Sequence, residues 1–161
     1  MPYKYKIFAL AIGIDVLFFD QLIKYFVLRK VPESGIFFVS TENLRIGLTL
    51  VKNVNIAFGI PLPQVFTFSI IAIILGLLGY FIFKNFKTES NFIILPLVGV
   101  VAAAISNLAD RLIHGGVIDY LSISTHNYQY PVFNLADAII VIGIIALLII
   151  NYKQKKIWKK Y

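Results

Sequence analysis

Four long apolar segments, separated by shorter polar stretches, set the pattern of the chain. They cover residues 7–28, 64–83, 92–113 and 132–152. Each is long enough to cross a bilayer as a helix, because about 20 apolar residues span the hydrocarbon core. The pattern therefore predicts a mainly α, polytopic membrane protein with four transmembrane helices, forming a single membrane domain over residues 1–161.

The connecting region at residues 29–63 has a different pattern. Residues 35–50 alternate in polarity and are rich in Phe, Val, Ile and Thr, and residues 41–43 suit a turn. Alternation of this kind is typical of β-strands. We therefore expect a small extracytoplasmic β-sheet within residues 29–63, followed by a helix that starts at Pro63.

The composition strengthens the membrane assignment. The chain is 59% hydrophobic and only 14% charged, whereas soluble domains average about 25% charged residues. It contains no cysteine, which excludes disulfide and thiolate chemistry. The first apolar segment is long, carries charges and lacks a small-residue cleavage site, so we expect no cleaved signal peptide.

The net charge of +7 could suggest a nucleic-acid partner, but the positions of the basic residues argue otherwise. They gather at the N-terminus, in the turn at residues 84–91 and in the tail at residues 153–160. Basic residues of this kind mark cytoplasmic ends of membrane helices. We predict that both termini are cytoplasmic, that the tail contacts anionic lipid, and that residues 106–137 face outward near the outer membrane surface.

Residues 106–137 hold three of the five aspartates of the chain, namely Asp110, Asp119 and Asp137. Ionisable groups near the apolar core of a bilayer are costly and are commonly functional. Two carboxylates that share a proton can divide acid and base roles and activate water against an amide. Asp119 and Asp137 are therefore candidates for a catalytic pair, without a metal or cofactor. The alternative is that Asp119 is a loop carboxylate and Asp137 a charge near a helix N-terminus.

Other polar residues leave two interpretations open. Asn107 shares a helical face with Asp110 and Arg111. These residues could form a polar network that positions substrate or the carboxylates. Alternatively, they could cap the end of the helix, with the Arg111 side chain extending to the membrane interface. Asn134 could cap the fourth segment or orient the pair. Asn53 could contact substrate or form a turn.

Charged residues of the first segment and the two histidines also have alternatives. Asp20 and Lys24, four residues apart, could bind substrate or form a pair that steadies the first helix. Asp15 is expected to hydrogen-bond to a neighbouring helix, with proton relay as the alternative. His114 and His126 could suggest a metal site, but ligand spacing is lacking, and we expect exposed loop residues.

Five short motifs resemble those of bacterial lipoprotein signal peptidase, also called signal peptidase II, over nearly the full length. They are DQLIK at 20–24, NVNIAFG at 53–59, NLADR at 107–111, GGVIDY at 115–120 and PVFNLAD at 131–137. Each motif is weak alone, but their order on four apolar segments is specific. The resemblance implies an aspartyl endopeptidase that cleaves prolipoproteins before a diacylglyceryl-modified cysteine.

The resemblance also assigns roles to individual residues. Asp119 and Asp137 match the catalytic pair of the family. The polar residues around its site are matched by Asn53, Asn107, Arg111 and Asn134, and its first-helix motif by Asp20 and Lys24. Three positions depart from the family pattern: Asn55 and Ile56 stand where glycine and alanine are usual, and Ser106 where glycine is usual.

The expected partners are lipid-modified prolipoproteins and membrane lipid, and the expected location is the bacterial cytoplasmic membrane. We expect a monomer. A small transporter is an alternative, because intramembrane aspartates and a basic face suit one, although the aspartates gather near one surface and there is no inverted repeat. A non-catalytic assembly factor is a further alternative, which should tolerate loss of either aspartate.

Overall fold

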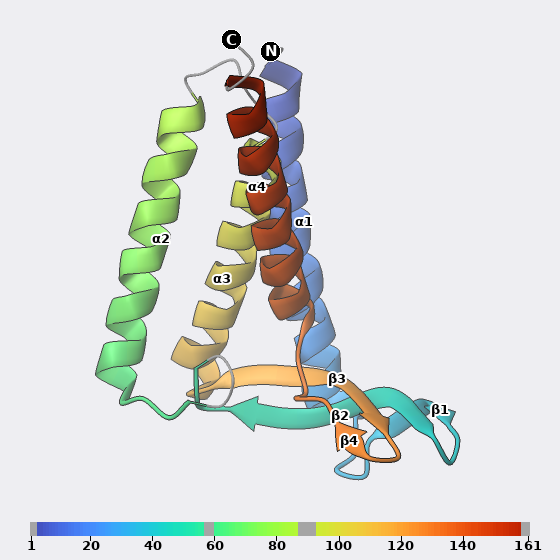
Figure 1. The fold of residues 1–161 in the computed structure, drawn as a ribbon. Coiled ribbons are helices and arrows are strands. Elements are labelled where there is room, and N and C mark those ends of the chain that lie inside the picture. The colour runs from blue at the N-terminus through green and yellow to red at the C-terminus, as the bar shows by residue number, and fades with distance from the viewer. Residues whose placement is uncertain (1–2, 57–59, 87–92, 159–161) are drawn as a thin grey trace.

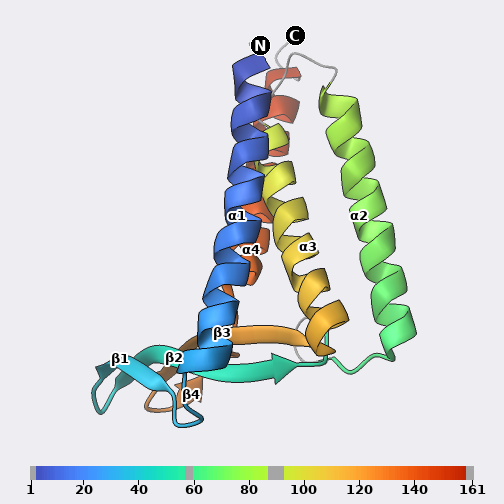
Figure 2. The ribbon, with the colours of Figure 1, turned by 180° about the vertical axis from the view of Figure 1, so that it is seen from behind.

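Four long helices form the body of the protein. The computed structural model describes residues 3–56, 60–86 and 93–158. The helices are α1 (Tyr3–Lys30), α2 (Gln64–Phe86), α3 (Ile94–His114) and α4 (Leu135–Trp158). Both views of the ribbon place α3 among the other three, with α2 set apart beside it (Figures 1 and 2). Contacts of α3 with α1, α2 and α4 make it the central helix.

Three of the helices are long and apolar enough to cross a membrane. Within the described residues these are Gln64–Asn85 of α2, Ile94–His114 of α3 and Leu135–Lys153 of α4, which agree with the second, third and fourth predicted segments. Helix α1 is not among them, because Asp15, Asp20 and Lys24 interrupt its apolar run. The mainly helical membrane architecture is confirmed, and the crossing of α1 stays a prediction.

A four-stranded antiparallel sheet lies across one end of the helices (Figure 1). Its strands, β1 (Ile36–Ser40), β2 (Leu44–Asn53), β3 (Val117–Thr125) and β4 (Tyr128–Gln129), are ordered as in the sequence. The predicted hairpin is confirmed: its turn lies at residues 41–43, and the backbone N–H of Leu44 donates to the Thr41 hydroxyl at 3.0 Å.

The second half of the sheet corrects the sequence prediction. The sheet was expected only within residues 29–63, but residues 117–125, after the third apolar segment, form β3 beside β2. Val117, Ile118 and Tyr120 are almost fully buried. Hydrogen bonding to β2 and the burial of these apolar side chains stabilise the strand.

Two local features bring α3, β3 and α4 together. Gly115 ends α3 in the left-handed conformation, with φ 71°, and its N–H donates to the Arg111 carbonyl, which is a common way for a helix to stop. Further on, Phe133 pairs with Leu121 of β3 through two hydrogen bonds, of 2.7 and 3.1 Å. The C-terminus of α3, the start of β3 and the N-terminus of α4 therefore converge.

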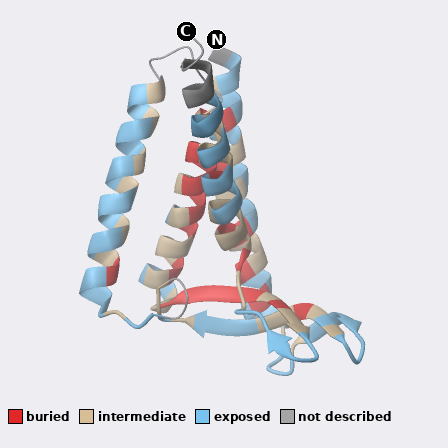
Figure 3. Cartoon of the chain, in the orientation of Figure 1, coloured by how far each residue is buried: buried red, intermediate tan, exposed pale blue. Residues whose placement is uncertain are grey.

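The buried residues follow α3 and β3, whereas α2 is largely exposed (Figure 3). Small side chains on the buried face of α3, such as Ala102 and Ala103, allow close helix approach. Glycines of the neighbouring helices do the same. A Cβ at Gly13 of α1 would collide with Val98, and one at Gly143 of α4 with Val100.

This close packing predicts a position-specific effect of a larger side chain. Gly143→Leu should destabilise the helix bundle by about 1–3 kcal/mol, because the new side chain overpacks the contact between α3 and α4. Thermal unfolding in detergent measures the effect. The control is Gly76→Leu, since a Cβ at Gly76 of α2 meets no atom within 4 Å. Equal unfolding temperatures for the two variants would contradict the close α3–α4 contact.

Candidate active site

Asp119 lies in β3, where it is 2% exposed and accepts two hydrogen bonds. Its partner on β2 is Val51, so Asn53, two residues further along β2, lies diagonally opposite on the same face. Asn53 Nδ2 donates to Asp119 Oδ2 at 3.0 Å, and Asn134 Nδ2 donates to Oδ1 at 2.7 Å. Both carboxylate oxygens are therefore held by side-chain amides.

Asp137 lies in the first turn of α4 and is held in the same manner. Asn107 Nδ2 of α3 donates to Asp137 Oδ1 at 2.9 Å. The backbone N–H of Asn134 donates to Oδ2 at 3.2 Å. The two aspartates therefore enter one hydrogen-bonded cluster from different elements, β3 and α4.

Asn134 joins the two aspartates directly. Its Oδ1 accepts the backbone N–H of Asp137 at 2.8 Å, which is the geometry of an N-terminal helix cap. Its Nδ2 donates to Asp119 at 2.7 Å and to Asn107 Oδ1 at 3.2 Å. The contacts that the two interpretations of Asn134 require, a cap on α4 and a bond to Asp119, are both present.

Arg111 holds the chain that follows β2. Its guanidinium donates to the Asn55 carbonyl at 2.7 Å, and the Asn55 N–H donates to Asn53 Oδ1 at 3.0 Å. Asn55 thus contributes to this contact only through its backbone, so a residue with a side chain can stand where glycine is usual. Residues 57–59, the end of the motif that begins at Asn53, lie outside the described residues.

The first-helix pair is part of the same cluster. Lys24 Nζ lies 2.6 Å from Asp20 Oδ2 and 2.7 Å from Asp110 Oδ2 of α3. It also donates to Asn107 Oδ1 at 2.9 Å. Asp20, Lys24 and Asp110 are at most 2% exposed. The interpretation of Asp20 and Lys24 as a buried pair that ties α1 to its neighbours agrees with this geometry.

Sequence reasoning missed three polar partners of this cluster. Ser106, which departs from the family pattern, donates its hydroxyl to Asp20 at 2.6 Å and accepts from Gln21 Nε2 at 2.9 Å. Gln21 also donates to Asp110 at 2.8 Å. The Tyr120 hydroxyl accepts the backbone N–H of Leu135 at 3.1 Å. Helical spacing could have indicated Ser106 and Asp110, which are four residues apart on α3.

The electrostatic environment favours a proton on Asp119. Burial raises the pKa of the Asp119 carboxyl from 3.8 to about 6. The hydrogen bonds from Asn53 and Asn134 and the charge of Lys24 lower the pKa, whereas the charge of Asp137 raises it further. A carboxyl of this kind can gain or lose a proton near neutral pH, which suits acid–base chemistry.

The remaining candidates lie elsewhere. Asp15 is exposed on α1, so its expected contact with a neighbouring helix is wrong. His114 is the last residue of α3 and half-buried, not an exposed loop residue, whereas His126 is exposed in the turn between β3 and β4. The described residues contain no group of three or more His, Cys, Asp and Glu side chains that could hold a metal.

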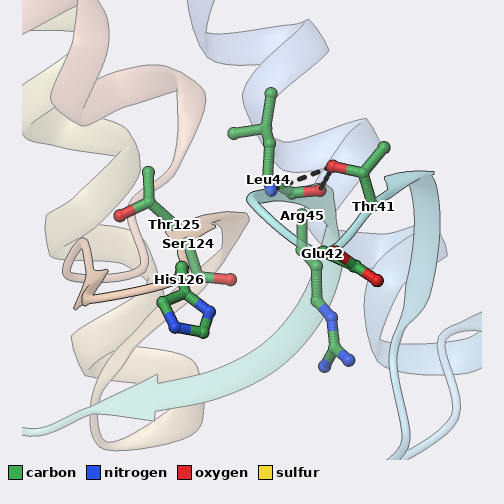
Figure 4. A pocket seen from close by; sticks show the side chains of 7 residues that line it. All are labelled: Thr41, Glu42, Leu44, Arg45, Ser124, Thr125 and His126. Atoms are coloured by element: carbon green, nitrogen blue, oxygen red, sulfur yellow. Dashed lines mark hydrogen bonds between the residues drawn. The ribbon is translucent and has the colours of Figure 1, made fainter.

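A surface pocket of about 270 Å³ lies at the far end of the sheet. Figure 4 shows Arg45 at the start of β2 and His126 in the turn after β3 among the side chains that line it. Asp119 is near the opposite end of β3, so this pocket is separate from the carboxylate cluster. The arrangement with a chemical rationale is the cluster, in which two carboxylates of unequal environment share one asparagine.

Comparisons with known proteins point to the same region of the chain. The family model described as Signal peptidase (SPase) II matches residues 12–153, a range that includes the whole cluster. The chain is 34% identical to a lipoprotein signal peptidase of Thermodesulfovibrio yellowstonii, over 92% of this chain and 98% of that protein. It is 33% identical to one of Staphylococcus carnosus, over 92% and 91% respectively.

A solved structure of a bacterial membrane enzyme, determined by the in meso method at 2.3 Å resolution, is also similar. Its TM-score is 0.76 at 30% identity, with 91% of this chain and 88% of that chain covered. A second such structure, at 1.9 Å resolution, gives a TM-score of 0.70 at 30% identity, over 88% and 90%. The arrangement of helices and sheet is therefore shared with solved membrane enzymes.

The dual contacts of Asn134 predict separable effects of two substitutions. Asn134→Ala removes the cap of α4 and should lower the free energy of unfolding by about 1 kcal/mol. Asn134→Ser retains a capping oxygen and should recover most of that loss. Both remove one of the two amide donors that lower the pKa of Asp119, so both should raise that pKa. Thermal unfolding and a pH titration measure the two effects, and identical unfolding temperatures would contradict the cap.

Proposed function

The chain belongs to the signal peptidase II family and removes signal peptides from lipoproteins, and we propose that it does so as an aspartyl endopeptidase with Asp119 and Asp137 as its catalytic pair. The observation that carries the proposal is the contact of Asn134 with both carboxylates, at 2.7 Å to Asp119 and 3.2 Å to Asp137. A site on α3, β3 and α4 thereby presents two acid–base groups to one substrate.

The reaction follows from a pair that holds one proton. Two close carboxylates do not both ionise readily, so one stays protonated. The ionised member takes a proton from water, whose oxygen attacks the scissile carbonyl carbon, while the protonated member donates to the carbonyl oxygen. When the tetrahedral intermediate collapses, the carbon–nitrogen bond breaks and the pair returns a proton to the leaving amine. Each cycle consumes one water and restores the original proton.

The surrounding amides support this chemistry. Asn53, Asn107 and Asn134 donate to carboxylate oxygens, which leaves few orientations open to either group. Arg111 holds the backbone at Asn55, beside the residues where a substrate backbone would enter. We assign all four to positioning of the catalytic pair and the substrate.

The proposed substrate is a prolipoprotein cleaved before a diacylglyceryl-modified cysteine, which the protein meets as a monomer. The helices α2 and α4 expose long apolar surfaces, and the carboxylate pair lies where the helices meet the sheet. A lipid-anchored peptide in the bilayer can reach this level laterally. The diacylglyceryl group would keep the cleavage site at the depth of the pair.

The proposed topology has four spans in the bacterial cytoplasmic membrane, with both termini cytoplasmic and the site facing outward. Helix α1 has 28 residues, which is about 42 Å at 1.5 Å per residue. Its Asp20 and Lys24 are buried against α3, so these charges do not face lipid and do not oppose crossing. Lys4 and Lys6 are at the start of α1 and Lys84 is in the last turn of α2. These helix ends lie away from the sheet (Figure 1), as expected if the basic residues are cytoplasmic.

The catalytic pair is tested with Asp119→Asn and Asp137→Asn, assayed on a lipidated prolipoprotein peptide with cleavage read by mass. Each variant should lose about 10²–10⁴-fold in turnover, because each removes one acid–base group with little change of shape. The double variant should be little worse than either single one, since the two groups act as a unit. Asp15→Asn, at an exposed aspartate of α1, should retain parental turnover.

Controls separate the alternatives. The same peptide with an unmodified cysteine should be cleaved much more slowly, and equal rates would contradict recognition of the lipid. Substantial turnover in either single variant with normal unfolding temperature would overturn the pair, as expected for an assembly factor or a transporter. Inactivation by a chelator would favour a metal site near His114 or His126.

The topology is tested by cysteine labelling, for which the absence of native cysteine gives a clean background. Ser40→Cys and Ser124→Cys, both in the sheet, should react with a membrane-impermeant reagent applied to intact cells. Lys153→Cys in α4 should react only after the membrane is opened. Labelling of Lys153→Cys from outside would refute the proposed orientation.

A further inference from the structure

Each aspartate of the proposed pair is preceded by a residue whose backbone N–H is bound by a buried carboxylate. The N–H of Ile118 donates to Asp110 Oδ2 at 3.0 Å, directly before Asp119. The N–H of Ala136 donates to Asp20 Oδ1 at 3.1 Å, directly before Asp137. Asp110 and Asp20 thus fix the backbone on which each catalytic carboxylate stands.

One ammonium connects these two anchors. Lys24 Nζ lies 2.6 Å from Asp20 and 2.7 Å from Asp110, and its third contact is Asn107 Oδ1 at 2.9 Å. Asn107 in turn donates to Asp137 at 2.9 Å. The three contacts use the three N–H donors of the ammonium. Each of the three partners is in turn bonded to Asp137 or to the residue directly before Asp119 or Asp137.

Stability alone gives a poor explanation for such a group. Removal of charges from water is costly, and a buried ion pair adds little stability compared with well-packed apolar residues. What an ammonium between two carboxylates provides is a fixed distance between them, since each contact is short and directional. Here that distance determines how far apart the starts of β3 and α4 lie.

We propose that Lys24, with Asp20 and Asp110, is a positioning residue that fixes the separation of Asp119 and Asp137. The inference rests on the proposed function, because it assigns a role relative to that pair. Lys24 touches neither carboxylate of the pair in the contacts described and acts through backbone and Asn107. Ser106 and Gln21 hold the outer side of this charged triad through Asp20 and Asp110.

Lys24 also acts on the pair through its charge, together with charged groups of α1, α3 and α4. These are Asp20 and Lys24 of α1, Asp110 and Arg111 of α3, and Asp137 of α4. The charge of Lys24 lowers the pKa of Asp119. Because the pair must hold one proton, activity falls as pH rises past this pKa, and loss of Lys24 should move that decline to higher pH.

The test is Lys24→Met, with Lys30→Met as the matched control. Lys30 is an exposed residue at the end of the same helix. Lys24→Met should lower kcat by about 10- to 100-fold through misplacement of the pair, leave KM within about twofold, and shift the alkaline decline of kcat/KM to higher pH. Lys30→Met should match the parent in all three quantities.

A second variant separates position from charge and guards against misfolding. Lys24→Met/Asp110→Asn removes one positive and one negative charge, so the triad retains its net charge and no second carboxylate is left unpaired. An asparagine oxygen can still accept the Ile118 N–H, but the bridge is gone, so kcat should stay low while the pH decline lies close to that of the parent.

Several results would overturn the proposal. Full recovery of kcat in the double variant would mean that Lys24 only balances charge. A lower unfolding temperature with parental kcat and pH profile would mean that its role is purely structural. The proposal that Asp119 and Asp137 are the catalytic pair is tested separately. Substantial turnover in Asp119→Asn, which has an intact Lys24, would refute it.

Discussion

A lysine ammonium buried in an apolar helix bundle must be fully paired, and this constraint governs the structure around Lys24. Its contacts with Asp20, Asp110 and Asn107 satisfy its three donors. Loss of one partner from such a group typically costs about 3–5 kcal/mol, because an uncompensated charge stays buried. The pairing therefore requires α1 and α3 to meet in one register. The same carboxylates then bind backbone N–H groups at the starts of β3 and α4.

The site depends on this arrangement in a direct physical way. A peptidase that uses two carboxylates needs both within reach of one water and in unequal environments. Asp119 is buried in β3 and its pKa is raised to about 6, while Asp137 stands at a helix N-terminus. Asn134 bonds to both. Rigid elements rather than loops hold the two groups, which favours reproducible geometry.

Apolar length and motif order made much of the architecture predictable from sequence. Helices α2, α3 and α4 and the β1–β2 hairpin lie where hydropathy and alternation placed them. Strand β3 was not predicted, although residues 121–124 alternate between apolar and polar side chains, because Asp119 and the serines favoured a loop interpretation. Its pairing with β2 joins residues far apart in the chain, such as Asn53 and Asp119, and no local pattern could indicate that pairing.

The residues that form the carboxylate cluster could be named from the sequence, but most of the contacts between them could not. The i, i+4 spacing of Asp20 and Lys24 indicated their ion pair, and Asn134 three residues before Asp137 indicated a cap. The bridge from Lys24 to Asp110 joins two helices, so no spacing within one helix could reveal it. The role of Ser106 as a hydrogen-bond donor to Asp20 depends on the packing of α3 against α1, which the sequence does not show.

The proposed chemistry requires that burial hold a shared proton on the pair of carboxylates near neutral pH. Infrared difference spectroscopy of the folded protein across pH measures carboxyl protonation without turnover, and Asp119→Asn identifies the contribution of that group. We expect a protonated carboxyl signal that titrates near pH 6 and is absent in Asp119→Asn. Ionisation of Asp119 at its ordinary value of 3.8, with an unchanged spectrum in the variant, would contradict it.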